Sequence, residues 1–563
     1  MDFKKILIDK LKDKINLSTE ELDKIIEVPQ DRTMGDLALP CFALAKTMRK
    51  APQAIAEEIK TSIDFEPDFE KVQAVGPYLN FFISKDQLMD SLVESFKADG
   101  AEYGKSDFGQ GRHVVIDYSS PNIAKPFHIG HIRSTLIGNA IYRIAKRLGF
   151  DPVGVNHLGD YGTQFGMLIA AYKEWGDKDE IEKNPIDEFL KLYVRMNQEI
   201  EENPEKREVA HEWFKKLEEK DEEAVSLWKW MRDLSLEEFN AVYDRLGIEF
   251  DSYNGEAFYQ DYLPEVVEEL RSKNLLTESD GCEIVEFDDG TTPFIITKSN
   301  GTTTYATRDI ATAEYRYRNY EFYKNLYVVA TEQNLHFKQL FKTLGLMGYE
   351  WSKDCEHVSF GMVSVKDGAL STRKGKVLYL KDVINKAEEK TLEIINERNP
   401  ELENKEDVAR QVGIGAIKFQ ELYNQRIKDY VFDWDRTLSF DGETGPYVQY
   451  TYARANSVIE KSGSKASFDD IKSEYLNDDE VVLMKEIYKL PNVIMDAFEK
   501  FEPYLVSRQI MEIVKEYNRY YYNNQINTDD EGLTKHRLGI SLMAKTAIKS
   551  GVSLLGMETP EKM

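Results

Sequence analysis

Two histidines three residues apart are the first residues in this chain whose types and spacing could do chemistry. His128 and His131 flank Gly130 where a short apolar run has ended and a helical pattern begins. A helix N-terminus offers free N–H groups and a partial positive charge, so it favours phosphate. Gly130 has no side chain, so a flat base could lie against the backbone there. The segment therefore predicts a nucleotide site; the alternative is a helix start capped by two histidines with no ligand.

The elements around these histidines predict a nucleotide-binding α/β sheet. Residues 113–118 are β-branched and apolar, which is typical of a buried strand, and apolar residues from Ile132 to Leu148 recur at helical spacing. Such sheets bind ligands at the carboxyl ends of their strands. The expected later elements are a second strand with a glycine-rich loop, a charged helical insertion, a hairpin, two more strands and a mostly helical remainder, at residues 151–166, 176–260, 281–298, 326–330, 358–365 and 380–563.

Length and composition restrict the class of protein. With 563 residues, 42% hydrophobic and 31% charged, the chain fits a soluble protein of about three or four domains. No stretch reaches the roughly 18 apolar residues that span a bilayer, and the N-terminus does not read as a secretory signal. Cys41, Cys282 and Cys355 lie far apart without metal spacing, so we expect reduced, buried thiols in a cytosolic protein. The net charge of −27 argues against a general nucleic-acid binder but permits a local basic contact.

The strings around and beyond the two histidines resemble those of arginyl-tRNA synthetases. FHIGH at residues 127–131 resembles the HIGH signature of class I aminoacyl-tRNA synthetases, and SSPNIAKPFHIGHIRST at 119–135 resembles its arginyl version. The further matching strings, in chain order, are NHLGDYGTQFG, YATRDIA, EQNLHF, LSTRKG and GPYVQY, at residues 156–166, 305–311, 332–337, 370–375 and 445–450. In the first of these, Tyr161 stands where the family has tryptophan.

This resemblance implies an α/β fold with a Rossmann-like class I catalytic domain that carries a helical insertion. It also implies an α/β N-terminal domain and an all-α C-terminal anticodon-binding bundle. The implied domains are an N-terminal tRNA-contacting domain, the catalytic domain, a helical connecting region and the anticodon-binding domain, at residues 1–105, 106–380, 381–435 and 436–563.

The implied reaction begins with attack of the arginine carboxylate on the α-phosphate of ATP, which positioning and charge stabilisation accelerate. The family's second signature, KMSKS, has its counterpart in the LSTRKG string, where Thr372 stands at the position of the second lysine. Lys125 is implied to take that lysine's place, and we expect Mg²⁺ to be held mainly by the phosphates rather than by a protein metal site. The implied catalytic residues are Lys125, His128 and His131; the implied ATP-binding residues are Phe127, His128, Gly130, His131, Leu370, Ser371, Arg373 and Lys374.

Arginine recognition requires planar carboxylate partners for a guanidinium. Asp117 ends the strand before the histidines, and Asp309 is predicted where another strand gives way to a helix. Either aspartate could instead be a helix cap. The residues that the resemblance assigns to arginine are Asp117, Ser119, Asn122, His131, Tyr305, Asp309 and Gln333.

The tRNA assignments combine basic residues for phosphates with aromatic residues for unpaired bases. The alternative for the N-terminal cations is a solvated helix face. The implied contacts are Lys46, Arg49, Tyr450, Arg454, Asn456 and Arg519.

The function expected from the whole chain is a cytoplasmic, monomeric arginine–tRNA ligase. Its partners would be L-arginine, ATP and tRNA(Arg), with no membrane, and the adenylation step is expected to need bound tRNA. The alternatives are a ligase of the same class for glutamine or cysteine, or a non-catalytic tRNA-binding paralogue. Cysteine is disfavoured because no Cys/His zinc constellation is present in the sequence.

Overall fold

A parallel sheet of four strands positions the two histidines. In the computed structural model, which describes residues 2–29, 31–365 and 379–563, the strand order is β10-β9-β4-β5. Asp117 lies opposite Val155 on one side and Tyr327 on the other. The chain passes from β4 to β5 and later returns to β9 on the other side of β4, so the crevice at the carboxyl ends of β4 and β9 is the topological switch point. The strands are β4 (His113–Asp117), β5 (Asp151–Val155), β9 (Lys324–Tyr327) and β10 (Cys355–His357).

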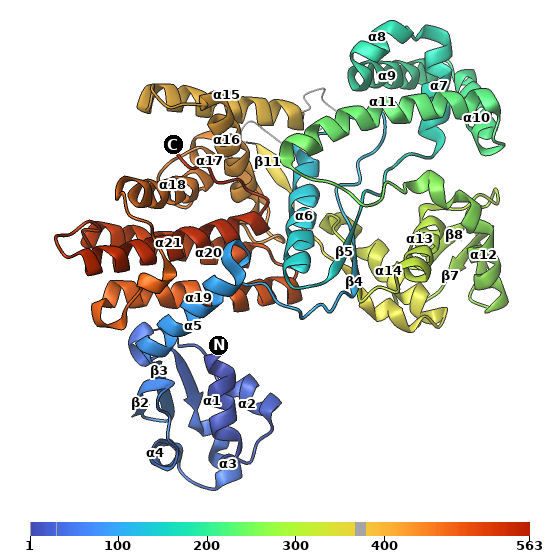
Figure 1. Ribbon diagram of the computed structural model, residues 1–563. Coiled ribbons are helices and arrows are strands. Elements are labelled where there is room, and N and C mark those ends of the chain that lie inside the picture. Colours follow the sequence, from blue (N-terminus) through green and yellow to red (C-terminus); the bar gives the residue numbers. More distant parts are fainter. Residues whose placement is uncertain (1, 30, 366–378) are drawn as a thin grey trace. The chain divides into compact units, whose positions relative to one another are not determined.

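Helices cover both faces of this sheet (Figure 1). One face packs against α6 (Ile132–Arg147), whose apolar residues are buried along its length. On the other face α13 (Tyr305–Tyr320) contacts β4, and α14 (Asn334–Leu346) contacts β10. The core on that side joins Val115 of β4 to Ile310 and Leu340. The predicted first strand and the long helix after it are therefore confirmed.

The chain between β5 and β9 holds a helical insertion and a small antiparallel sheet of order β6-β7-β8. Its longest helix, α11, is capped by the Asp221 carboxylate, which accepts a hydrogen bond from the Ala224 N–H at 3.0 Å, and it ends at Gly247 in the left-handed conformation. The elements are α7 (Thr163–Trp175), α8 (Lys178–Lys183), α9 (Pro185–Glu202), α10 (Glu205–Glu218), α11 (Glu222–Leu246), α12 (Leu263–Ser272), β6 (Thr277–Ser279), β7 (Cys282–Val285) and β8 (Phe294–Thr297).

Beyond the sheet the chain is mostly helical, as predicted. A short parallel pair joins β11 (Val363–Val365) to β12 (Tyr430–Phe432). The helices are α15 (Leu380–Arg398), α16 (Lys405–Leu422), α17 (Trp434–Thr437), α18 (Gly445–Lys461), α19 (Asp478–Glu499), α20 (Tyr504–Asn523) and α21 (Glu531–Leu554).

The described chain divides into two compact units. The larger unit contains the parallel sheet and consists of Gly104–Arg454, Pro491–Met511 and Ile548–Met563. The smaller unit consists of Met1–Tyr103, Ala455–Leu490 and Glu512–Ala547.

In the smaller unit, an antiparallel sheet of order β1-β3-β2 packs with helices, so the N-terminal block is α/β as predicted. The Phe3 N–H donates to the Tyr488 hydroxyl at 2.9 Å, and Lys485 pairs with Asp36 at 2.8 Å. These contacts join the block to helical residues of the same unit. Its elements are α1 (Phe3–Lys12), α2 (Thr19–Ile25), β1 (Leu37–Pro40), α3 (Ala45–Met48), α4 (Pro52–Ser62), β2 (Phe69–Val75), β3 (Tyr78–Ile83) and α5 (Lys85–Asp99).

Two sequence predictions of local structure are wrong. Asp309 does not follow a strand but lies inside α13, because the Thr304 hydroxyl caps that helix by accepting from the Ala306 N–H at 3.1 Å. Of the single strand expected over 358–365 only β11, Val363–Val365, forms, because β10 already ends at His357. Between the two strands Gly361 lies close to the chain around Asp429, where a Cβ would be 2.5 Å from an Asp429 carboxylate oxygen.

The burial of the cysteines agrees in part with the sequence prediction. All three cysteines are free; Cys41 and Cys355 are buried, whereas Cys282 is only half-buried, contrary to prediction. In the described part of the chain, no helix combines the length and the apolar character that crossing a membrane requires.

A buried arginine joins α6 to the helical region that follows the sheet. Arg133 is 1% exposed, and its Nε lies 2.7 Å from the Glu421 carboxylate on α16. The guanidinium also donates to the carbonyls of Gly361, Lys428 and Arg426, at 2.8, 2.8 and 3.1 Å. Because four hydrogen bonds of one side chain reach three separate segments, this ion pair fixes the first helix of the sheet against α16.

We expect Arg133→Met to lower the free energy of unfolding of the larger unit by about 3–5 kcal/mol, because it leaves the Glu421 carboxylate buried without its cation. Urea unfolding of the full chain measures this, and Glu421→Gln should show a loss of the same kind. The control is Arg271→Met, which breaks exposed pairs with Glu268 and Glu283 and should cost at most about 1 kcal/mol. Equal losses in the two arginine variants would contradict a structural role for the buried pair.

Candidate functional site

Each of the two histidine rings accepts a backbone hydrogen bond from within the motif at the start of α6. The His128 ring accepts a hydrogen bond from the Gly130 N–H through Nδ1 at 3.0 Å, and the His131 ring accepts from the His128 N–H through Nδ1 at 3.3 Å. The ring centroids are 4.1 Å apart. This is a reciprocal cap, so the capping alternative holds locally. It occupies only one nitrogen of each ring.

Both imidazoles are held in the neutral form. Burial lowers the pKa of His128, and burial together with the neighbouring His128 ring lowers the pKa of His131 to about 3. Because Nδ1 of each neutral ring accepts a hydrogen bond, its proton lies on Nε2. The motif therefore offers two uncharged N–H donors, which suit phosphate or carboxylate oxygens.

The absence of a side chain at Gly130 leaves room for the ring of His128. A Cβ at Gly130 would lie 2.7 Å from Cε1 and 2.8 Å from Nδ1 of that ring. Phe127, which is buried, packs its ring against His131 at 5.3 Å, and its carbonyl accepts from the Leu380 N–H at 2.9 Å. A β-bridge joins His128 to Tyr379. The segment that precedes α15 is thus paired with the histidine motif, residues 127–131.

Lys125 lies in the same loop without a protein partner. It makes no hydrogen bond or ion pair with any described residue, and it is half-buried. Burial lowers the pKa of its ammonium, against the attraction of the nearby Glu256 carboxylate. An unpaired, partly desolvated ammonium near two N–H donors is suited to an anionic ligand.

Asp117 lies at the carboxyl end of β4, as predicted, but its carboxylate is already paired. One oxygen lies 2.7 Å from Nη2 of Arg316, and the other accepts from the Ser120 hydroxyl at 2.8 Å. Arg316 comes from α13, is 1% exposed and lies over the Tyr327 ring. Sequence analysis missed Arg316, because Asp309, Thr312 and Arg316 share one face only if α13 is recognised as a helix.

Asp309 is held by a histidine that sequence analysis quoted but did not assign. Nε2 of His336, on α14, lies 2.6 Å from the Asp309 carboxylate. Burial acts to raise the pKa of Asp309, but the hydrogen bond and charge of His336 outweigh it, so the net pKa is lowered. The exposed ring of Tyr305 lies 4.9 Å from the His336 ring. Asp309 is therefore an oriented anion with an aromatic side chain close to its partner.

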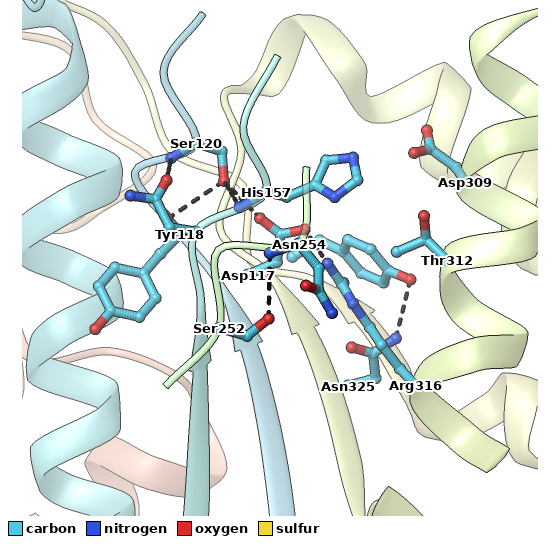
Figure 2. Close-up of polar contacts among 12 residues, drawn as sticks. Asp117, Tyr118, Ser120, His157, Ser252, Asn254, Asp309, Thr312, Arg316 and Asn325 are labelled. Atoms are coloured by element: carbon cyan, nitrogen blue, oxygen red, sulfur yellow. Dashed lines mark hydrogen bonds and ion pairs between the residues drawn. The ribbon is translucent and has the colours of Figure 1, made fainter. Parts of the chain in front are cut away.

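His157 lies between the two acids in the close-up (Figure 2). Its backbone N–H donates to the Ser120 hydroxyl at 3.1 Å. Its ring nitrogen Nδ1 is buried without a hydrogen-bond partner among the described residues. The sequence places it in the glycine-rich loop after β5. Asp117, His157 and Asp309 thus converge at the carboxyl ends of the strands, where such sheets bind ligands.

The other predicted arginine contacts differ in their surroundings. Ser119 is buried, and its hydroxyl is hydrogen-bonded to those of Tyr243 and Thr135 at 2.7 and 2.8 Å, so its contact with arginine stays a prediction. Asn122 is exposed and lies beside Gly159, where a Cβ would be 2.2 Å from its amide oxygen. Gln333 is exposed and precedes α14. The predictions on Leu370, Ser371, Arg373 and Lys374 lie outside the described residues.

The predicted tRNA contacts lie in both units. In the smaller unit Lys46 and Arg49 are exposed at α3, and Arg519 pairs with Glu516 at 2.9 Å and Asp479 at 3.4 Å. In the larger unit Tyr450 is 39% exposed beneath the guanidinium of Arg454.

Asn456 is the least exposed of the predicted tRNA contacts that the structure describes. It is 4% exposed, and its amide bonds to Glu460 and Lys545 within the smaller unit. Its contact with RNA therefore stays a prediction.

Comparison with known protein families matches three family models along the chain. Residues 93–434 match the model described as tRNA synthetases class I (R), catalytic domain. Residues 448–563 match the DALR anticodon binding domain, and residues 1–83 match the arginyl tRNA synthetase N terminal domain.

Curated relatives and solved structures agree with these matches. The chain is 54% identical to the arginine–tRNA ligase of Halothermothrix orenii and 49% identical to that of Clostridioides difficile, each over 100% of both chains. The arginyl-tRNA synthetase structure from Plasmodium falciparum has a TM-score of 0.81 at 25% identity, covering 96% of this chain and 94% of that one. The Thermus thermophilus arginyl-tRNA synthetase shares the fold, with a TM-score of 0.82 at 24% identity and 96% coverage of both chains.

Gly130→Ala tests the histidine motif. The added methyl group displaces the His128 ring from the Gly130 N–H, so we expect ATP–pyrophosphate exchange to fall by about tenfold or more. The free energy of unfolding should change by less than about 1 kcal/mol, because only a side chain must move. The control is Gly345→Ala on α14, whose Cβ would make an ordinary 3.6 Å contact with Ser352. An unchanged exchange rate in Gly130→Ala would contradict a role for the His128 ring position.

Proposed function

This chain belongs to the arginyl-tRNA synthetases, class I aminoacyl-tRNA synthetases with arginine–tRNA ligase activity, and from that premise we propose which of its residues carry out each part of the reaction. The substrates of the ligase are arginine, ATP and tRNA. The observation that carries the proposal is that Asp309, oriented by His336, lies with Asp117 and His157 at the carboxyl ends of the strands (Figure 2), on the sheet whose first helix begins with two uncharged N–H donors.

Asp309 is the principal acceptor for the guanidinium of the substrate. The bond from His336 fixes one carboxylate oxygen at 2.6 Å, which leaves the remaining lone pairs of the carboxylate for a planar, bidentate donor. Asp117 contributes through the lone pairs that Ser120 and Arg316 do not occupy. The exposed ring of Tyr305 covers the guanidinium plane. Asn122, Gln333 and the Nε2–H of His131 are available to the α-amino and carboxylate groups.

The triphosphate is bound at the start of α6. The neutral rings of His128 and His131 donate Nε2–H to phosphate oxygens, and the backbone at Gly130 with Phe127 forms the surface for adenine. The ammonium of Lys125 stabilises the leaving pyrophosphate. Leu370, Ser371, Arg373 and Lys374 are proposed to contribute to ATP binding on sequence grounds alone.

Mg²⁺ is held mainly by the ATP phosphates, because this ion keeps several waters and prefers phosphate oxygens. Among the described residues no group of three His, Cys, Asp or Glu side chains lies together in a way that could hold a metal ion. When bound, the ion supplies charge neutralisation at the phosphates.

The tRNA-binding residues are proposed from exposure and charge. Lys46 and Arg49 of the smaller unit are exposed cations, and Tyr450 with Arg454 presents a ring and a guanidinium in the larger unit. Arg519 contributes if RNA phosphate displaces its carboxylate partners. The domain division at 1–105, 106–380, 381–435 and 436–563 is supported by the order of the three family matches.

Three further properties belong to the same proposal. The adenylation step depends on bound tRNA, which the family resemblance supports. The enzyme acts as a monomer in the cytoplasm, and its three free thiols are consistent with a reducing compartment.

The test of arginine recognition is charging of tRNA with arginine, lysine and citrulline by the wild type and by Asp309→Asn. We expect the wild type to charge arginine alone. In Asp309→Asn the loss of a charged hydrogen-bond acceptor costs about 1.5–3 kcal/mol of binding free energy, which should raise the KM for arginine about 10- to 100-fold. The preference of this variant for arginine over citrulline should be smaller than that of the wild type. The control is Asp289→Asn, an exposed aspartate paired with Lys342. Charging of lysine as fast as arginine by the wild type would overturn the assignment.

A second experiment tests Lys125. We expect Lys125→Ala to lower the rate of ATP–pyrophosphate exchange about 10²- to 10³-fold with little change in stability, since the ammonium has no described protein partner to lose. The matched control is Lys146→Ala, an exposed lysine on α6. A Lys125 variant that keeps its turnover while Lys146→Ala also keeps it would remove Lys125 from the mechanism.

A further inference from the structure

The loop of residues 119–125 lies between β4 and the histidine motif and contains three residues in the left-handed backbone conformation. Ser119, Ser120 and Ala124 have φ angles of 69°, 47° and 57°, and none of them is a glycine. This conformation brings the Cβ of an L-residue too close to its own backbone, so it persists only where surrounding contacts hold it. Lys125 follows the last of the three, and its ammonium has no hydrogen bond or ion pair with any described residue. The position of that ammonium therefore depends on what holds the loop.

One face of the insertion helix α11 holds this loop at two points. Ser235 and Tyr243 are both buried and lie about two turns apart on that face. The Ala124 N–H donates to the Ser235 hydroxyl at 3.2 Å, and the Tyr243 hydroxyl lies 2.7 Å from the hydroxyl of Ser119. The helix thus contacts the loop at its first left-handed residue and at its last, directly before Lys125.

The bond between Tyr243 and the loop is part of a continuous chain of hydrogen bonds that ends on the histidine motif. The Asn156 amide, in the loop after β5, donates to the Tyr243 hydroxyl at 3.2 Å. The Ser119 hydroxyl is also bonded to that of Thr135 at 2.8 Å, and the Thr135 hydroxyl lies 2.7 Å from the His131 carbonyl oxygen. Burial raises the pKa of Tyr243, so its hydroxyl stays protonated and can both accept and donate. The helix α11 is therefore linked to the start of α6 through the loop.

We propose that Tyr243 and Ser235 are positioning residues that hold the loop so that the Lys125 ammonium is directed at the pyrophosphate leaving ATP, an inference that rests on the role of Lys125 in the proposed function. The helix is a suitable support, because buried side chains on a helix are fixed more precisely than those on a loop. Without the two hydroxyls, the left-handed residues would relax toward ordinary backbone angles and displace Lys125. A displacement of about 1 Å can lower a rate about 10²-fold.

The experiment measures ATP–pyrophosphate exchange by the full chain with tRNA present. The loop variants are Ser235→Ala and Tyr243→Phe, and the matched controls are Ser95→Ala and Tyr253→Phe. The Ser95 hydroxyl donates to a carbonyl of its own helix, α5, at 2.8 Å, as the Ser235 hydroxyl does in α11. The Tyr253 hydroxyl donates to Asn240 of α11 at 3.0 Å. Neither control hydroxyl has a hydrogen bond to the loop within the described chain, and the thermal midpoint verifies that each variant is folded.

We expect both loop variants to lower kcat for exchange about tenfold or more, with the KM for ATP changed less than about threefold. The reason is that the Lys125 ammonium is proposed to stabilise the pyrophosphate as it leaves rather than to bind ATP in the ground state. Both controls should keep the wild-type kcat. Wild-type kcat in the loop variants, equal losses in loop variants and controls, or a loss confined to KM would overturn the positioning role.

A double-mutant cycle tests whether the loop acts through Lys125. In the Lys125→Ala background, Ser235→Ala should cause less than about twofold further loss of kcat, because the ammonium that it positions is absent. A further loss equal to that in the wild-type background would overturn the inference. A low rate in Lys125→Ala together with wild-type rates in both loop variants would overturn the inference alone and leave the proposed function intact. A wild-type rate in Lys125→Ala would instead contradict the proposed function, and the inference with it.

Discussion

The buried ion pair between Asp117 and Arg316 is the interaction on which the geometry of the site depends. It joins the carboxyl end of the central strand β4 to the middle of α13, at 2.7 Å and with both side chains almost fully buried. Removing one member of such a pair costs about 3–5 kcal/mol, because the other charge stays buried. The pair therefore fixes the rotation of α13 about its axis. Asp309, two turns earlier on the same face, is thereby held toward the crevice rather than toward solvent.

This arrangement also balances charge at the site proposed to bind the guanidinium. Arg316 neutralises most of the charge of Asp117, so Asp117 alone would attract a second cation weakly. Asp309 has only an imidazole as its partner, at 2.6 Å, and its lowered pKa keeps it ionised. In the proposed function the two acids thus differ in role: Asp117 supports the scaffold and lends free lone pairs, and Asp309 is the principal acceptor for the guanidinium. An uncharged analogue would leave lone pairs of Asp309 without a matched donor, so we expect it to bind more weakly.

Sequence analysis predicted the elements with strong periodicity and missed those set by tertiary contacts. The strand before the histidines and the helix after them follow from β-branched and helical patterns, and the structure confirms both. The threonine run before Tyr305 resembled a strand, whereas a hydroxyl cap turns it into the start of α13. Arg316 and His336 were not predicted as site residues because each acts through a distant partner. Asp117 precedes Arg316 by 199 residues and Asp309 precedes His336 by 27, and no local pattern reveals such contacts. The Ser119 hydroxyl likewise has its partner, Tyr243, far along the chain, which no local pattern reveals.

The acidity of the chain is compatible with its use of tRNA, because the repulsion from the net charge and the attraction of single cations act at different distances. A net charge of −27 repels RNA at long range, but salt screens that repulsion beyond about 8 Å at physiological ionic strength. Most lysines and arginines of the helical insertion are paired with nearby carboxylates, for example Lys173 with Glu223 and Lys206 with Glu174. Because those cations are paired within the fold, the proposed tRNA contacts fall on exposed cations such as Lys46 and Arg49. Acidity elsewhere then disfavours non-specific RNA without weakening these few proposed contacts.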